Sequence, residues 1–260
     1  MTQRLVETAP IRQDRPLFLN SFTPDIMKLI TSLAFTAAAF CLAAPQLLQA
    51  DLSAGMETGD PGLKSIGSIA FGPEGILFVA DPKGAALVAI STNDTKPWAG
   101  SEKISISNIN GEVAGVLGTS PDAIIIEDLA VNPVSNRPYL SVSRGKGPDA
   151  IPAILCIDSS GGLHLFDTAS VKYSKVSLKD APEDKVSGEG RRQKNSRLES
   201  ITDIAYLDGK LIIAGLSNEE FASSLRSVDF PFSDKIQRTT VEIFHGAHGK
   251  FETRSPIRTF

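Results

Sequence analysis

Short apolar runs alternate with turn residues along the chain, and one arrangement of them occurs three times. In one copy, the apolar stretch Asp203–Ala205 leads into the turn Asp208-Gly209, and a second apolar stretch, Leu211–Ala214, follows. Apolar runs of this length bounded by Gly, Pro, Asn or Asp predict β-strands, and their recurrence indicates a repeat architecture. The other two copies lie at Ser68–Phe71, Pro73–Gly75 and Ile76–Ala80, and at Asp128–Val131, Asn132-Pro133 and Tyr139–Val142.

The run Ile76–Ala80 is apolar at consecutive positions and not at alternate ones. A strand of this kind is buried on both faces, so we expect sheets that are stacked face to face. In the first copy, Leu87–Ser91 and the alternating stretch Lys103–Ser107 complete a predicted set of four strands. The one helical signal after residue 50 is a short helix near 110–117, which Gly118 terminates.

The amino-terminal part of the chain has the order of a secretory signal peptide at residues 27–50. Lys28 is followed by the uncharged apolar run Leu29–Ala44 and then by small residues up to Ala50. This run is shorter than the roughly 20 residues that a membrane span needs, so the signal peptide is favoured over a membrane anchor. Met27 is then the expected start, and residues 1–26 are expected to be a misassigned or disordered extension.

After the signal, we expect three segments of different character. Residues 51–64, rich in Gly, Asp and Pro, predict an extended lead-in. Residues 65–260 hold the repeated units. Within them, the sharp shift to Lys, Glu, Asp, Ser and Arg at 171–198 predicts a polar surface insertion.

Charge and cysteine content narrow the function classes. The formal net charge is −4, which gives no basic footprint for nucleic acid, and no stable membrane span is expected after signal cleavage. Cys156 is the only cysteine after residue 50 and lies in an apolar run, where a buried, inert thiol is expected. The sequence contains no haem-attachment motif and no nucleotide-binding motif.

The pattern of Ser68–Asp81, Ile-Ala followed by Pro-x-Gly and Leu-Phe-Val-Ala-Asp, resembles the blades of secreted bacterial β-propellers of the NHL and YVTN type. The resemblance covers most of residues 65–260. It implies an all-β fold, namely a partial β-propeller of about three blades of four-stranded antiparallel sheet, with one short helix near 110–117. Such propellers include binding modules, scaffolds, lactonases and quinoprotein enzymes, so the resemblance implies no single activity.

The number of repeats raises the question of completeness. Propellers typically close a ring of four to eight blades, whereas three copies are recognised here. The chain ends in the strand-like stretch Ser255–Phe260. We therefore expect the sequence to be a carboxy-terminally incomplete fragment of a larger propeller.

Acidic residues occupy matching positions in two of the copies. Asp128 and Asp203 each open an innermost strand, with Glu127 adjacent to the first and Glu199 four residues before the second. In a propeller, these strand starts ring one mouth of the central channel. Carboxylates that converge there would hold Ca²⁺ or another hard cation through oxygen ligands. The alternative is that they accept hydrogen bonds from nearby turn amides.

His245 and His248 form an H-x-x-H pattern in a glycine-rich loop. A zinc site needs three or four ligands, and neither a cysteine pair nor a Glu-x-x-His accompanies these two residues. The other interpretations are a loop histidine that contacts a ligand or the channel, and a solvated loop.

The common hydrolase and dinucleotide-binding signatures are absent. We therefore expect an exported protein, periplasmic or secreted, that binds or scaffolds an unknown protein or small-molecule ligand. The alternative is a metal-assisted hydrolase of lactonase or esterase type. Its site would comprise Asp128, Asp203, Glu199 and one of the histidines His245 and His248 around the channel.

Overall fold

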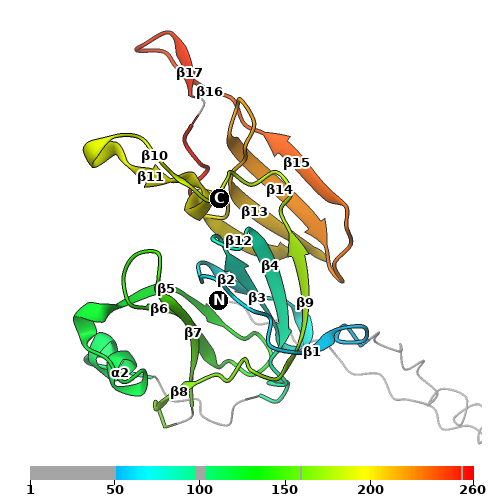
Figure 1. Ribbon diagram of the computed structural model, residues 1–260. Coiled ribbons are helices and arrows are strands. Elements are labelled where there is room, and N and C mark those ends of the chain that lie inside the picture. The colour runs from blue at the N-terminus through cyan, green and yellow to red at the C-terminus, as the bar shows by residue number, and fades with distance from the viewer. Residues whose placement is uncertain (1–50, 98–103, 159, 253) are drawn as a thin grey trace, which may run out of the picture. The chain divides into compact units, whose positions relative to one another are not determined.

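A computed structural model describes residues 51–97, 104–158, 160–252 and 254–260 (Figure 1). These residues form three large antiparallel sheets, each of which contains one of the three predicted copies, and two small two-stranded hairpins. The expected signal peptide at 27–50 and the extension at 1–26 lie outside the described residues. Among the described residues, no helix has the length and apolar character that a membrane crossing requires.

The first sheet has the order β1-β9-β4-β3-β2. Every residue of β3 and β4 is buried, which confirms the burial on both faces predicted for Ile76–Ala80. A 3₁₀ turn, η1 (Pro73–Gly75), joins the first two inner strands. The strands are β1 (Glu57–Gly59), β2 (Ile69–Phe71), β3 (Ile76–Asp81), β4 (Ala86–Ser91) and β9 (Val171–Ser177).

The outer strand of this sheet is not the one that the sequence predicts. Residues 104–107 of the expected strand Lys103–Ser107 lie outside any strand, and Lys103 lies outside the described residues. β9 pairs with β4 instead, and its Val171 and Val176 are buried. The open edge of β4 requires a partner, and tertiary context of this kind overrides local composition. The start of the expected polar insertion at 171–198 is therefore part of the first sheet.

The second sheet has the order β5-β6-β7-β8, and the helix α2 (Ile109–Val116) packs against it. The helix near 110–117 is confirmed. Asn108 caps it, because its side chain accepts a hydrogen bond from the backbone N–H of Gly111. A 3₁₀ turn, η2 (Pro121–Ala123), leads from the helix side into the sheet. The strands are β5 (Ile124–Val131), β6 (Pro138–Arg144), β7 (Ile151–Ile157) and β8 (Leu163–Leu165).

The third sheet has the order β12-β13-β14-β15, with strands β12 (Asp203–Leu207), β13 (Lys210–Leu216), β14 (Ser223–Asp229) and β15 (Ile236–Thr240). Before it come the hairpin of β10 (Val186–Ser187) and β11 (Lys194–Asn195) and the turns η3 (Gly190–Arg192) and η4 (Ser196–Glu199). After it comes the hairpin of β16 (Ile243–His245) and β17 (Lys250–Glu252).

The first sheet lies between the other two (Figure 1). One of its faces packs Phe78 and Leu87 against Leu211 and other residues of the third sheet. Its other face packs Leu77 and other side chains against Tyr139 of the second sheet. The inner strand β2 contacts both β5 and β12, the inner strands of its neighbours. The fold is therefore all-β, with three sheets of at least four antiparallel strands stacked as the blades of a partial β-propeller.

Candidate functional site

One polar side chain from each of the three inner strands or the residue before it meets at a single point. Asp203 opens β12 as predicted and Ser68 directly precedes β2, whereas Asp128 lies in the middle of β5, which extends back to Ile124. The Ser68 hydroxyl lies 2.9 Å from Oδ2 of Asp128 and 3.1 Å from Oδ1 of Asp203. The backbone N–H of Ile69 donates to the same Asp128 oxygen, at 2.9 Å. A serine hydroxyl carries one proton, so Ser68 donates fully to only one of the two carboxylates. The structure thus brings together the two aspartates that the sequence places at matching strand starts.

A fourth segment reaches the same point. Thr259 donates from its hydroxyl to Oδ2 of Asp203, at 2.7 Å. We call the row of Asp128, Ser68, Asp203 and Thr259 the polar axis. Each member stands third in a four-residue pattern of Ile, any residue, a Ser, Thr or Asp, and an apolar residue. The four copies are Ile66–Ile69, Ile126–Leu129, Ile201–Ile204 and Ile257–Phe260.

This pattern identifies residues that the sequence analysis missed. Ser68 and Thr259 are uncharged, so a search for paired carboxylates passes over them. The sequence does contain a pattern that predicts them: Ser68 and Thr259 each stand two residues after an isoleucine, as Asp128 and Asp203 do.

Beside the polar axis lies a cavity of about 430 Å³, which we call the axial cavity. Its wall is formed by residues of the second sheet, by residues that flank the inner strands of the first and third sheets, and by the segment that ends at Phe260. The second residue of each four-residue pattern lines it: Gly67, Glu127, Thr202 and Arg258. The other lining residues are Lys64, Ser65, Ile66, Ser68, Pro82, Lys83, Ser143, Gly147, Pro148, Ala150, Leu198, Glu199 and Ile201.

A β-bulge sets the position of Glu127. The register of β5 against β6 shifts between Ile126 and Asp128, so that Glu127 has no partner in the ladder. A bulge re-aims the extra side chain, and here the Ser143 hydroxyl donates to Oε1 of Glu127 at 2.6 Å. The exposed Glu127 therefore stands in the cavity wall with its second carboxylate oxygen available to a ligand.

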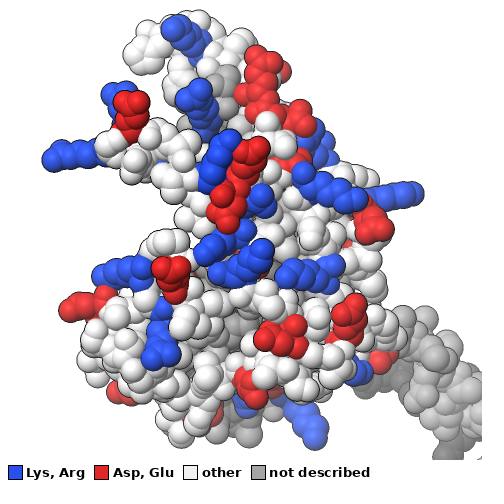
Figure 2. All heavy atoms as spheres, in the orientation of Figure 1, with Lys and Arg blue, Asp and Glu red and all other residues white. Residues whose placement is uncertain are grey.

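Glu199, at the end of η4, faces two cations. Its Oε1 lies 2.8 Å from Nη2 of Arg258, and its Oε2 lies 3.1 Å from Nζ of Lys194. Figure 2 shows that Lys and Arg side chains gather across the middle of the face seen in Figure 1, close to the end of the chain. Glu199 is thus an ion-paired wall residue of the axial cavity.

The two histidines lie elsewhere. His245 belongs to β16, and His248 lies in the turn between β16 and β17, where its backbone N–H donates to the His245 carbonyl at 3.1 Å. Both line a separate pocket with Lys250 and Phe251, and neither is part of the wall of the axial cavity. Within the described ranges, no group of three or more His, Cys, Asp or Glu side chains is placed to hold a metal ion.

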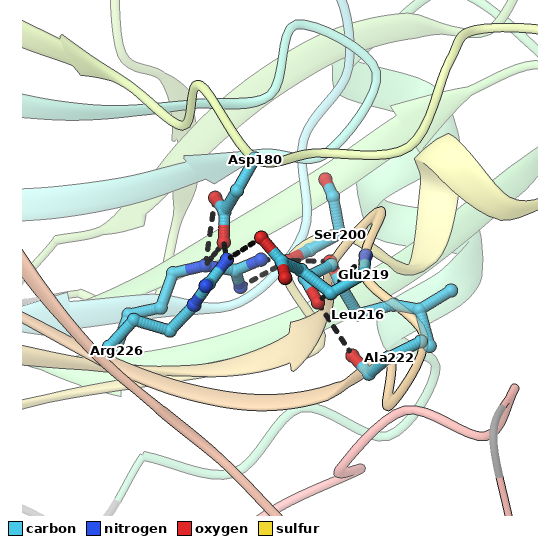
Figure 3. A network of polar contacts seen from close by, with 8 residues as sticks. Asp180, Ser200, Leu216, Glu219, Ala222 and Arg226 are labelled. Atoms are coloured by element: carbon cyan, nitrogen blue, oxygen red, sulfur yellow. Dashed lines mark hydrogen bonds and ion pairs between the residues drawn. The ribbon is translucent and has the colours of Figure 1, made fainter.

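A second polar cluster, the Asp180 network, consists of Asp180, Arg226, Arg238 and Glu219. Figure 3 labels three of its members, Asp180, Arg226 and Glu219. Nε of the fully buried Arg226 donates to both Asp180 carboxylate oxygens, at 3.2 and 3.0 Å. Its two terminal nitrogens donate to the carbonyls of Ser200 and Leu216, at 3.2 and 2.9 Å. Burial lowers the pKa of Arg226, whereas the charge of Asp180 and its hydrogen bonds oppose that shift.

Arg238 completes this network. Its Nη1 lies 3.1 Å from Asp180 and 2.9 Å from Glu219, and these hydrogen bonds raise its pKa. The backbone of Asp180 also accepts a hydrogen bond from Asn218, at 2.8 Å. The network therefore fastens the chain that leaves β9 onto the third sheet.

No family model matches the chain, and no curated protein matches it. Among solved structures, the PQQ-bound form of aldose sugar dehydrogenase from Streptomyces coelicolor is 12% identical in sequence to this chain. The match covers 75% of this chain and 85% of that chain, with a TM-score of 0.21. At this level, the likeness carries no argument about ligand or reaction, and the NHL or YVTN type stays a prediction.

Proposed function

We propose that this chain is an exported binding protein whose ligand is a small molecule held in the axial cavity. The observation that carries the proposal is that all four copies of the four-residue pattern, one beside or within each inner strand and one in the segment ending at Phe260, contribute to the wall of this cavity. Ligand sites are commonly concave and have a few converging polar groups. Each of the three sheets is thus associated with one copy of the pattern whose second residue lines the wall, and this residue differs among the copies: Gly67, Glu127 and Thr202.

The polar groups of the wall favour binding over chemistry. The carboxylate of Glu199 is held by two cations, and that of Glu127 is held on one side by Ser143. Groups that are fixed in this way orient a ligand and give it specificity. The metal-assisted hydrolase alternative, with Asp128 and Asp203 as ligands, stays a prediction.

Blocking the cavity tests the proposal. Ala150 is half-buried in the wall, so Ala150→Trp should fill part of the cavity. Small-molecule probes that raise the melting temperature of residues 51–260 should lose this effect in Ala150→Trp. They should keep it in Lys235→Trp, which adds the same side chain at an exposed position outside the cavity. Equal responses of the two variants would contradict the proposal.

Export is the second part of the proposal, and it is supported by the order of Lys28, the apolar run Leu29–Ala44 and the small residues before Asp51. Amino-terminal sequencing of protein from the native host should begin near Asp51. Recovery from the cytoplasm of a chain that still carries residues 27–50 would contradict export.

A further inference from the structure

A buried carboxylate organises one wall of the axial cavity. Asp81 is fully buried at the end of β3. It accepts hydrogen bonds from the backbone N–H groups of Lys64, Ser65 and Gly84 at 3.0, 2.9 and 2.9 Å, and from the Ser65 hydroxyl at 2.9 Å. Hydrogen bonds to an ionised carboxylate are stronger than those between neutral groups, so Asp81 holds these backbone segments firmly together. We call this arrangement the Asp81 knot.

The geometry of the knot is tight. A Cβ atom at Gly84 would lie 2.1 Å from Oδ2 of Asp81, so only glycine fits there. The Ser65 hydroxyl also accepts a hydrogen bond from the backbone N–H of Lys83, at 2.9 Å. The backbone of Lys64 and that of Lys83, distant in sequence, are therefore fixed to one another at the cavity wall.

The two lysines differ from the other charged residues of the wall in their partners. Arg258 is paired with Glu199. The ammonium group of Lys83 donates to a carbonyl, that of Pro148, and to no carboxylate among the described residues. The ammonium group of the exposed Lys64 has neither a hydrogen bond nor an ion pair within the part of the chain that the structure describes.

The acidic groups nearby do not supply the missing partner. The oxygens of Asp81 are taken by the donors of the knot, and those of Glu199 by Arg258 and Lys194. Glu127, on the opposite strand β5, accepts from Ser143 and leaves one oxygen available. The wall of the cavity thus contains two lysines whose backbone is fixed by hydrogen bonds and one glutamate with an oxygen that accepts no hydrogen bond from the described residues.

We propose that the axial cavity takes a small ligand bearing an anionic group, a carboxylate or a phosphate, which Lys64 and Lys83 bind, while a hydroxyl or amine of the ligand donates to Glu127. This assignment rests on the proposed binding function. Asp81 and Ser65 act as positioning residues, because they accept hydrogen bonds from the backbone N–H groups of Lys64 and Lys83.

Binding of two simple anions tests the assignment. Inorganic phosphate and malate are titrated separately into residues 51–260 at low ionic strength, and amide chemical shifts are followed. At least one anion should shift the amides of residues 64–67 and 82–84. Because hydrogen bonds to charged groups are the stronger ones, Lys64→Gln combined with Lys83→Gln should weaken this binding about tenfold or more, whereas the matched variant Lys235→Gln should leave it unchanged.

The two probes separate the anion classes. Malate carries a hydroxyl for Glu127 and phosphate in its monoanionic form carries its own, so Glu127→Gln should weaken whichever probe binds. A response to malate alone identifies a carboxylate ligand, and a response to phosphate alone identifies a phosphate ligand. Either result supports the assignment.

The positioning role of Ser65 has its own test. Ser65→Ala removes both hydrogen bonds of the hydroxyl and should weaken anion binding, whereas Ser65→Thr, which keeps the hydroxyl, should restore it. A variant that lowered the melting temperature and left the affinity for the anion unchanged would show that Ser65 has a structural role only.

The outcomes distinguish this inference from the proposed function. Anion binding of equal strength in the wild type and the double lysine variant would overturn the inference. So would a neutral sugar probe that binds, is blocked by Ala150→Trp and is indifferent to the lysines, although the binding function would then stand. If neither charged nor neutral probes bind in the cavity, both proposals fail.

Discussion

The Asp180 network and the polar axis both join separate parts of the chain through carboxylates, but they differ in the charge of the donors that serve these carboxylates. In the Asp180 network, the fully buried Arg226 gives its donors to one carboxylate and two carbonyls. At the polar axis, the carboxylates of Asp128 and Asp203 accept hydrogen bonds from neutral donors only, the backbone N–H groups of Ile69, Leu129 and Ile204 and the hydroxyls of Ser68 and Thr259. A buried ion pair loses more when one partner is removed than a partly buried carboxylate loses with one neutral donor.

The strongest test of this difference removes Arg226. Arg226→Met keeps much of the side-chain volume but leaves Asp180 without its main partner. Loss of one member of a buried ion pair costs about 3–5 kcal/mol, and because the Asp180 side chain is 22% exposed, we expect about 3 kcal/mol less free energy of unfolding. Urea denaturation of residues 51–260 measures this change.

Arg238→Gln is the matched control for that variant. It removes a cation from the same carboxylate, but the Arg238 side chain is 30% exposed, so solvent replaces the lost contacts. We expect less than about 1 kcal/mol. Equal losses for the two arginines would mean that burial does not decide the strength of this network.

The polar axis should respond more weakly. Ser68→Ala removes the hydroxyl that lies between Asp128 and Asp203, and we expect a loss of about 1 kcal/mol in the free energy of unfolding. Urea denaturation of residues 51–260 measures this loss as well. A loss above that for Arg226→Met would reverse the ranking of the two clusters.

The exposed pair of Asp158 and His164 should contribute still less to the free energy of unfolding, and its contribution should depend on pH. Hydrogen bonds from Ser160 above all, and then from His164 and Gly162, hold the pKa of Asp158 well below its usual value of 3.8. A lowered pKa in the folded state contributes stability above the unfolded value, and that stability is lost as pH falls through the folded value. The difference in unfolding free energy between wild type and Asp158→Asn should therefore be present at neutral pH and shrink as the pH falls below the usual value of 3.8.

Removal of divalent cations should have the smallest effect. If the polar axis is a set of hydrogen bonds, EDTA should leave the melting temperature unchanged. A decrease that Ca²⁺ reverses, and that Asp203→Ala abolishes, would instead support the metal-assisted hydrolase with Asp128 and Asp203 as ligands.

In the first sheet, local sequence predicts the inner strands well and the outer strand poorly. The consecutive apolar residues of Ile76–Ala80 require burial on both faces wherever they lie, and β3 has it. The outer strand β9 contains Lys172 and Lys175, so its composition indicates a solvated segment. Its pairing with β4 depends on an edge some 80 residues earlier in the chain, which no local pattern contains.

The candidate site divides in the same way. The equivalence of Asp128 and Asp203 follows from the repeat, and both contact Ser68. Asp203 opens β12 as predicted, whereas Asp128 does not open β5, because that strand extends back to Ile124. The aim of Glu127 follows from a bulge, which depends on the register against β6. His245 and His248 lie on the hairpin of β16 and β17, away from the axial cavity. Their position could not be predicted, because sequence order alone does not place a hairpin relative to the cavity. The functional roles of these residues stay predictions.

The strand β9 follows the second sheet in sequence but completes the first, and this order affects how the chain folds during synthesis. Ser91 at the edge of β4 pairs with Lys172, so the whole second sheet is synthesised between the two partners. Contacts of such long sequence separation form slowly, because the chain loses the entropy of closing a long loop before the contacts stabilise it. A nascent chain that has reached residue 160 has every strand of the second sheet except β8, but β4 still has an open edge. The first sheet, central in space, is therefore completed after the second, and a chain cut between them should expose that edge to aggregation.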